Sequence, residues 1–207
     1  KSTIAKLLAH DQNILYLDTG AMYRACALAA IRAGIDVSDE AQVCGLMRNV
    51  TLTVTYENGA QHTLLNGEDV SEVIRDREVS MAASTISKHE SVRMRLAEKQ
   101  REIAGKMSCV LDGRDIGTFV LPDADFKFFL TASPEVRAKR RYDELVAKGN
   151  SVDFEDLKRE IALRDEQDST RAIAPLKKAD DAVLIDTSDM TIQQVLQTIK
   201  NKMQEKI

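Results

Sequence analysis

The sequence contains few cysteines, no long apolar segment and no excess of positive charge, and each absence excludes a class of protein. Its three cysteines, at positions 26, 44 and 109, lack metal-site spacing, so we expect free thiols in a reducing, cytoplasmic compartment. The longest apolar run, 25–31, is too short to span a bilayer, and the charged opening stretch predicts no signal peptide. The net charge of −4 predicts neither nucleic acid nor a membrane as partner, so an anionic substrate would require locally gathered arginines.

What the sequence does contain is short apolar strands separated by long helical patterns. Its length of 207 residues fits one compact domain with room for a small inserted lobe. Such alternation is typical of an α/β fold, in which a parallel sheet is covered by helices on both faces. The strands are predicted at 12–17, 108–113, 126–132 and 182–186, and the helices at 21–34, 75–105, 134–148, 153–168 and 190–204.

Residues 50–73 interrupt this alternation with a pattern of a different kind. Polar and apolar residues alternate up to Glu57, and an Asn-Gly pair follows at 58–59, where a tight hairpin turn would lie. A second strand pattern ends at another Asn-Gly pair, at 66–67. The segment therefore predicts a small antiparallel insert in an otherwise parallel protein.

The first three residues, Lys1, Ser2 and Thr3, precede a helical pattern. In phosphate-loop proteins a Gly-Lys-Ser/Thr motif opens a helix whose amides bind phosphates, while the lysine contacts the β and γ oxygens and the hydroxyl holds Mg²⁺. The triplet by itself also fits an ordinary helix start. If it belongs to a phosphate loop, we expect the first strand of the sheet and the loop glycines to precede Lys1.

Polar residues follow two of the predicted strands. One strand leads into the sequence DTG at 18–20, with Arg24 one helical turn further on, and another leads into DGRDIG at 112–117. Ligands of open α/β sheets bind beyond the carboxyl ends of the strands, so these residues indicate a site. Asp112 could orient water bound to Mg²⁺, or it could be a capping residue of the turn.

A second group of charged residues, Arg164, Asp168 and Arg171, recurs at helical spacing near the end of the pattern 153–168. The three would share one helical face if the helix extends that far. They form either a solvated stripe of ion pairs or a second part of the site. The same two interpretations apply to a basic cluster in the preceding helix, made of Arg137, Arg140 and Arg141.

Four strings, in order, resemble the bacterial cytidylate kinase family. They are LDTGAMYRA (17–25), NGEDVSEVIR (66–75), LDGRDIGT (111–118) and LRDEQDSTRAIAPL (163–176). The resemblance covers essentially the whole chain and implies a phosphate-loop nucleoside monophosphate kinase fold. Its five-stranded parallel sheet would have its first strand before Lys1. The implied parts are core segments 1–47, 106–138 and 157–207, a monophosphate-binding lobe at 48–105 that contains the antiparallel insert, and a short lid at 139–156.

The resemblance also implies a reaction, in which the γ-phosphoryl group of ATP is transferred to CMP or dCMP with Mg²⁺ as the metal ion. The implied catalytic residues are Lys1, Arg114, Arg164 and Arg171. The implied ATP and Mg²⁺ residues are Lys1, Ser2, Thr3, Asp112 and Arg140, with Ser2 as the metal ligand. The implied CMP residues are Thr19, Arg24, Ser84, Arg93, Arg114, Asp115, Arg164, Asp168 and Arg171. The family often has Gly-Thr after the lysine, so Ser2 is a mild departure.

The implied base contacts make a prediction about specificity. Cytosine offers an amino donor at N4 and acceptors at N3 and O2, which suit the Asp115 carboxylate and the donors Arg93 and Ser84, whereas uracil reverses this pattern. A site whose polar groups are left unpaired rejects the wrong analogue, so we expect CMP or dCMP in preference to UMP. The alternatives are a kinase of UMP or AMP and a nucleotide-binding regulatory module without turnover. We expect a monomer.

Overall fold

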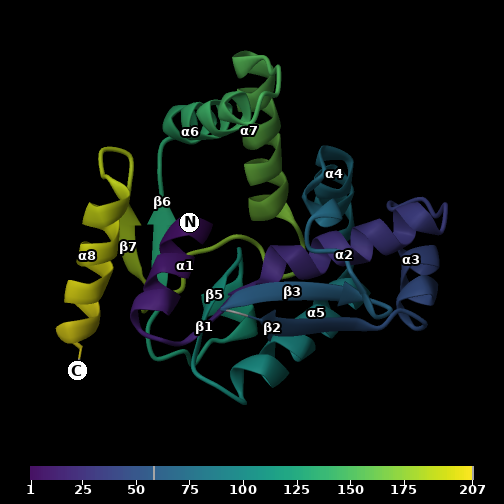
Figure 1. Cartoon of the computed structure of the whole chain (residues 1–207), viewed down its shortest axis with the longest axis horizontal. Helices are drawn as coiled ribbons and strands as arrows, with labels where there is room; N and C mark the ends of the chain where they lie inside the picture. The colour runs from purple at the N-terminus through teal and green to yellow at the C-terminus, as the bar shows by residue number, and fades with distance from the viewer. Residues whose placement is uncertain (58, 207) are drawn as a thin grey trace. The chain divides into compact units, whose positions relative to one another are not determined.

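The computed structural model describes residues 1–57 and 59–206, and the chain divides into two compact units, Lys1–Leu121 and Pro122–Ile207. Each unit contains parallel strands with helices (Figure 1). The predicted α/β class is therefore confirmed. The four predicted strands pair two by two, one parallel pair in each unit. Among the described residues, no helix is both long and apolar enough to cross a bilayer.

The first unit is built around the parallel strands β1 and β5. Asp18 lies opposite Asp112, so the carboxyl ends of the two strands are level. The elements of this unit are α1 (Ser2–Asp11), β1 (Leu15–Asp18), α2 (Thr19–Arg32), α3 (Glu40–Met47), β2 (Leu52–Glu57), β3 (Ala60–Leu65), β4 (Glu68–Asp69), η1 (Val73–Arg75), α4 (Arg77–Ile86), α5 (Glu90–Ala104), β5 (Cys109–Asp112) and η2 (Ile116–Val120).

Helix α2 forms the centre of the core of this unit. It begins directly after β1, with the Asp18 carboxylate accepting from the Ala21 amide at 3.0 Å, and it is buried on most sides. Its small alanines let α4, α5 and the insert pack closely against it, and the core includes Met22, Leu28 and Ile86. The helix ends at Arg32 and the backbone then turns at Gly34, whose φ of +65° suits glycine, as predicted.

The antiparallel insert is present where the sequence predicts it. Strands β2 and β3 pair from Leu52 opposite Leu65 to Glu57 opposite Ala60. Asn58 of the predicted turn lies outside the described residues, while Gly59 has a φ of +76°. The second Asn-Gly pair, 66–67, has positive φ at both residues and joins β3 to β4, as a tight hairpin requires.

Two features of this unit differ from the sequence-based expectation. The helical pattern at 75–105 is divided into η1, α4 and α5, because the backbone is extended at Asp76 and the chain turns again at His89, whose Nε2 donates to the Val37 carbonyl at 2.7 Å. Helix α3 was not predicted, since it buries only Val43 and Met47 and so has a weak periodic pattern. The turn at His89 depends on a contact with a residue 52 positions away in the sequence.

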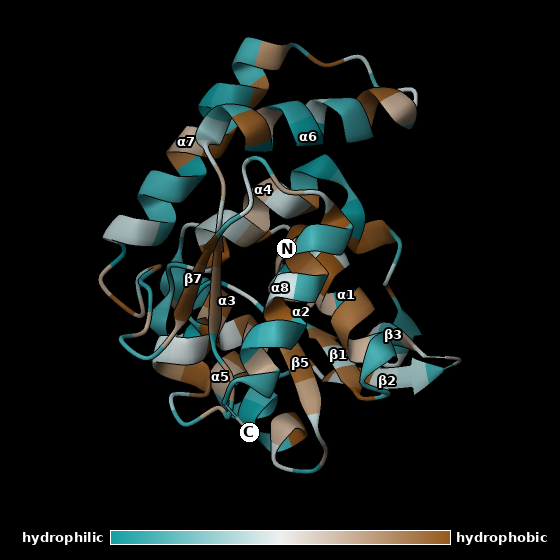
Figure 2. Ribbon diagram, turned by 90° about the vertical axis from the view of Figure 1, so that its left-hand side faces the viewer, coloured by the Kyte–Doolittle hydropathy of each residue, from teal (hydrophilic) through white to brown (hydrophobic). Residues whose placement is uncertain are grey.

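The second unit contains another parallel pair, β6 and β7, with Phe128 opposite Val183 and Thr131 opposite Asp186. Ser133 caps the helix that follows β6 by accepting from the Val136 amide at 3.2 Å, as predicted. Figure 2 shows β1 and β5 of the first unit mostly brown, and α6 of this unit mostly teal. The elements are β6 (Phe128–Thr131), α6 (Pro134–Ala147), α7 (Phe154–Thr170), β7 (Val183–Asp186) and α8 (Ile192–Gln204).

Candidate active site

The carboxyl ends of β1 and β5 are joined by a side-chain contact. The hydroxyl of Thr19 donates to the backbone carbonyl of Asp112 at 2.7 Å, and Thr19 is buried. Gly113 leaves room for this contact, because a Cβ there would lie 2.8 Å from the Thr19 hydroxyl and 2.6 Å from Ile116. The two predicted polar strand ends are therefore hydrogen-bonded to each other and closely packed.

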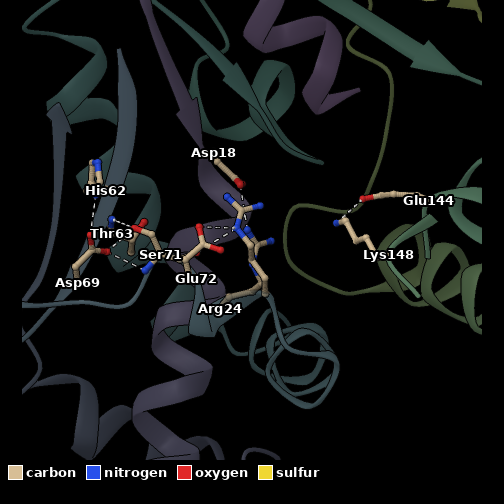
Figure 3. A network of polar contacts seen from close by, with 10 residues as sticks. Asp18, Arg24, His62, Thr63, Asp69, Ser71, Glu72, Glu144 and Lys148 are labelled. Carbon is tan, nitrogen blue, oxygen red and sulfur yellow. Dashed lines mark hydrogen bonds and ion pairs between the residues drawn. The ribbon is translucent and has the colours of Figure 1, made fainter. Parts of the chain in front are cut away.

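Arg24 lies beside these strand ends, held by the residue that ends β1. Its Nη2 is 3.0 Å from the Asp18 carboxylate, and both side chains are about three-quarters buried, with 21% and 25% exposed (Figure 3). A Cβ on Gly20 would lie 3.0 Å from Arg24 Nη1, so glycine at this position leaves the guanidinium its place. Among the described residues, none bonds the buried Arg24 Nε. An unsatisfied, charged donor at a strand end is well suited to an anionic ligand.

The triplet Lys1-Ser2-Thr3, which the resemblance assigns to a phosphate loop, lies at the start of α1, which packs against β1 and β5. Ser2 is the first residue of the helix, Lys1 precedes it, and all three residues, Thr3 included, are exposed. The first amides of a helix have no partner within it, so a phosphate at this end would find donors and a favourable dipole.

Tyr16 shows that the start of α1 and the strand ends share one electrostatic environment. Burial raises the pKa of Tyr16, and the carboxylates of Asp18 and Asp112 raise it further, while Ser2 and Arg24 lower it. Ser2, Arg24 and Asp112 of the predicted site therefore all influence the pKa of the partly buried Tyr16 side chain. The sequence placed Arg24 and Asp112 at one expected site through the strand ends, whereas only the family resemblance linked Ser2 to them.

A buried ion pair lies in the turn after β5. Arg93, on α5, pairs through Nη2 with the Asp115 carboxylate, and the two side chains are only 1% and 8% exposed. Arg93 Nη1 also donates to the Ser87 carbonyl at 2.9 Å, and the guanidinium lies 5.6 Å from the centre of the Tyr23 ring. The structure thus brings together two of the three residues predicted to contact the base.

Two further predicted residues of this unit, Ser84 and Arg114, lie within a few residues of groups that bind Arg93. Ser84 is on α4, and its carbonyl accepts from the hydroxyl of Ser87, the residue whose own carbonyl binds Arg93. Arg114, partly buried, stands in the turn between Gly113 and Asp115. All the predicted site residues from Lys1 to Asp115 therefore lie in or beside the turns and helix ends at one edge of β1 and β5, or on α4 and α5.

In the second unit, Asp168 and Arg171 form a compact turn at the end of α7. Both side chains are buried, Arg171 Nη1 is 3.3 Å from the Asp168 carboxylate, and Arg171 Nε donates to the Ala174 carbonyl at 2.8 Å. The backbone of Asp168 also accepts from the Leu176 amide at 2.7 Å. The helix ends at Thr170 and Arg171 is extended, so the condition for a single helical face is not met.

The basic cluster of α6 divides into three different environments. Arg140 donates to the backbone carbonyl of Thr187 at 2.6 Å, which ties α6 to the segment after β7. Arg137 forms a two-bond ion pair with Asp165 of α7, and this contact raises the pKa of the Arg137 guanidinium. Arg141 has an exposed partner on its own helix, Glu144, at 2.9 Å. Arg164, the remaining predicted residue, is exposed on α7.

Sequence reasoning missed two residues that shape the site of the first unit. Asp18 was noted as part of a turn, but its pairing with Arg24 was not predicted, although the spacing of six residues across a helix start permits it. Gln61 of the insert hydrogen-bonds the backbone of Asp18, a residue 43 positions away. No local pattern could have signalled that contact.

The fold and the arrangement of polar residues define a class of protein, the phosphate-loop nucleoside monophosphate kinases. A family model described as cytidylate kinase matches residues 1–205. The chain is 46% identical to the cytidylate kinase of Geobacillus sp. (strain WCH70), over all of this chain and 92% of the relative. It is 45% identical to that of Bacillus subtilis (strain 168), again over all of this chain and 92% of the relative. The chain belongs to the cytidylate kinase family, as the resemblance predicted, and family membership implies the use of ATP.

Proposed function

We propose that the cytidylate kinase activity of this chain is the transfer of the γ-phosphoryl group of ATP to CMP or dCMP, giving ADP and CDP or dCDP. The observation that carries the choice of base is the buried pair of Arg93 and Asp115. Burying two charges costs desolvation free energy, and two apolar side chains in their place would often stabilise the fold equally well. Stability alone therefore does not account for the pair, whereas a bound base that uses both charged groups does. The carboxylate accepts from cytosine N4, and Arg93 and Ser84 donate to N3 and O2.

The monophosphate is bound by arginines, each of which can hold two phosphate oxygens. Arg24 contributes a buried Nε with no bond to the described residues and a guanidinium already oriented by Asp18. Arg114, Arg164 and Arg171 complete the charge neutralisation, Thr19 lies beside the acceptor, and Asp168 accepts from a ribose hydroxyl. The lobe at 48–105 carries the base contacts Ser84 and Arg93, and the lid at 139–156, which includes Arg140, closes over ATP and excludes water.

ATP is bound at the start of α1 by Lys1, Ser2 and Thr3. No group of three or more His, Cys, Asp or Glu side chains able to hold a metal occurs among the residues described. Mg²⁺ commonly uses one or two protein oxygens together with substrate phosphates. The Ser2 hydroxyl would be its protein ligand, and Asp112 would orient its bound water. When bound, Mg²⁺ supplies neutralising charge for the β and γ phosphates.

The chemical step demands little covalent help from the protein. The acceptor phosphate is already anionic, so no general base is required, and the transition state needs alignment and charge neutralisation above all. Lys1, which precedes α1, and the arginines named above would provide both. The same number of charged groups would be unnecessary for a module that only binds nucleotide, which disfavours that alternative.

ADP release with Mg²⁺-ATP and CMP, dCMP, UMP or AMP in parallel tests this proposal. We expect rapid turnover of CMP and dCMP, weak turnover of UMP and none of AMP. Rapid turnover of UMP or AMP would overturn the assignment of the base contacts. If no ADP is released with any of the four monophosphates, although the protein binds ATP, the result would instead favour the regulatory binding module.

A further inference from the structure

Strand β1 has an edge that faces away from its partner, and the side chain of Gln61 covers it. Leu15 donates its amide to the Ser108 carbonyl on the β5 side, at 3.2 Å. Backbone groups alternate in direction along a strand, so those of Asp18 point to the opposite side. There Gln61 Oε1 accepts from the Asp18 amide at 2.7 Å, and Gln61 Nε2 donates to the Asp18 carbonyl at 3.3 Å.

The residue held in this way orients Arg24. One carboxylate oxygen of Asp18 accepts from the Ala21 amide and caps α2, and the other pairs with Arg24 Nη2 at 3.0 Å. A change in the backbone at Asp18 therefore moves both the start of α2 and the guanidinium. Thr19, which closes the two strand ends, is the next residue in the chain.

The insert presents Gln61 in a fixed orientation. Its Nε2 also donates to the hydroxyl of Thr63, two residues along β3, at 3.3 Å. The backbone amide of Asp18, which only donates, and its carbonyl, which only accepts, determine which end of the Gln61 amide is the donor. Thr63 is 1% exposed, and its amide donates to the Ser71 hydroxyl at 2.8 Å. Figure 3 shows this contact together with those of Asp69, which ties Ser71 to His62.

We propose that Gln61 is a positioning residue, through which the insert holds Asp18 and thereby Arg24 in the arrangement that binds the monophosphate. Gln61 acts through Asp18 and Arg24, and no contact of its own with substrate is required. The proposal rests on the role of Arg24 under the proposed function. It gives the insert a task of its own, separate from the base contacts on α4 and α5, because its β3 strand reaches the end of β1 directly.

The replacement Gln61→Met tests the proposal, because it keeps the length of the side chain and removes both bonds to Asp18. We expect the KM for CMP to rise about tenfold, with kcat changed less, while the KM for ATP stays within about twofold. The matched control is Gln42→Met, which removes an exposed bond to Asp39 in the same unit and should leave both KM values unchanged.

A second comparison separates positioning from general structural support. If Gln61 acts through Arg24, then Gln61→Met should add little to the KM for CMP in a chain that already carries Arg24→Met. Additive effects of the two changes, equal rises in both KM values, or no change at all would each overturn the proposal. Calorimetric titration of CMP into the same proteins gives the same test without turnover. A wild-type chain that neither binds nor phosphorylates CMP would refute the proposed function instead.

Discussion

The two units of the chain each contain an ion pair between an arginine and an aspartate, and the surroundings of the two pairs differ. In the first unit Arg93 and Asp115 are 1% and 8% exposed, whereas in the second Arg137 and Asp165 are both 34% exposed. Water still solvates the second pair and screens it, but the first pair has lost that solvation. The same two side-chain types therefore affect the free energy of unfolding differently. Removing one partner of the buried pair should lower it strongly, whereas the partly exposed pair contributes little to it.

The helices of the first unit also bury more apolar side chains than those of the second. Helix α2 of the first unit buries a long run of small and apolar residues, while α6 buries only Ala138 and α7 only Leu157 and Asp168. Helices α6 and α7 are joined instead by polar contacts and by the edge-to-face packing of Tyr142 on Phe154. Segments with few buried apolar contacts open more easily, which suits the proposed lid.

The largest expected effect is the loss of activity on replacing Arg24. Arg24→Met should lower kcat/KM for CMP by about 10²- to 10⁴-fold, as expected for the loss of a preorganised charged donor. Arg32→Met is the matched control, since Arg32 lies on the same helix and pairs with the exposed Glu68. Steady-state kinetics of the two variants checks this. Equal kinetics would show that Arg24 has no place in the site.

Breaking the buried pair should have the largest effect on stability. Asp115→Ala leaves the Arg93 charge buried without its partner, so we expect a loss of about 3–5 kcal/mol in the free energy of unfolding, measured by denaturant titration. Replacing both residues by apolar ones should recover much of this loss. A destabilisation below about 1 kcal/mol for Asp115→Ala would contradict the distinction between the two pairs.

Closing the gap at Gly113 should be the next most harmful change. A Cβ there meets Ile116 at 2.6 Å and the Thr19 hydroxyl at 2.8 Å, so Gly113→Ala should destabilise the chain by about 1–3 kcal/mol and impair turnover. Gly45→Ala is the control, because nothing lies within 4 Å of its Cβ position in α3. Alanine there should stabilise by about 0.5–1 kcal/mol. Thermal unfolding of both proteins tests the contrast.

The half-exposed pair of the second unit should tolerate substitution. Asp165→Ala should lower the free energy of unfolding by no more than about 1 kcal/mol, and added salt should reduce the difference. Denaturant titration at low and high ionic strength measures both quantities. A loss as large as that expected for Asp115→Ala would mean that exposure does not govern these pairs.

The smallest effect concerns the exposed pair of His62 and Asp69 in the insert. The hydrogen bond to Asp69 raises the pKa of His62 above its ordinary 6.5, while Ser71 first and His62 second lower the pKa of Asp69 to about 2. The contribution of His62 is therefore fully present below pH 6.5 and lost as the pH rises through its folded pKa. We expect His62→Gln to lower Tm by about 1 °C at pH 5.5 and by nothing measurable at pH 9. The opposite pH dependence would refute the pairing.

Much of the fold was predictable because its signals are local. The strands at β1, β5, β6 and β7 are short apolar runs, and the cap at Ser133 and the Asn-Gly turn at 66–67 have strong local preferences. The end of α7 was predicted within two residues, since the helical pattern stops at 168 and the helix ends at Thr170. The division at His89 was not predicted, because the helical pattern continues there and the bond to Val37 redirects the chain.

The charged residues of the candidate site were identified from the sequence through family resemblance, but their partners were not. Arg93 finds Asp115 at a separation of 22 residues, and Gln61 finds Asp18 at 43. Nothing in the local sequence distinguishes Arg93, almost fully buried, from Arg137, one-third exposed. Burial and pairing depend on which elements pack together, and a periodic pattern does not report that.

By itself, then, the sequence determined the α/β class, the antiparallel insert, the family and the identity of the charged groups, because these depend on short-range preferences and on strings of residues. The tertiary structure alone decided which charges are buried, that the buried Arg24 Nε has no bond to the described residues, and how the insert reaches the end of β1. Those features arise when segments distant in the sequence exclude water from one another, and only then does the same ion pair become a strong or a weak interaction.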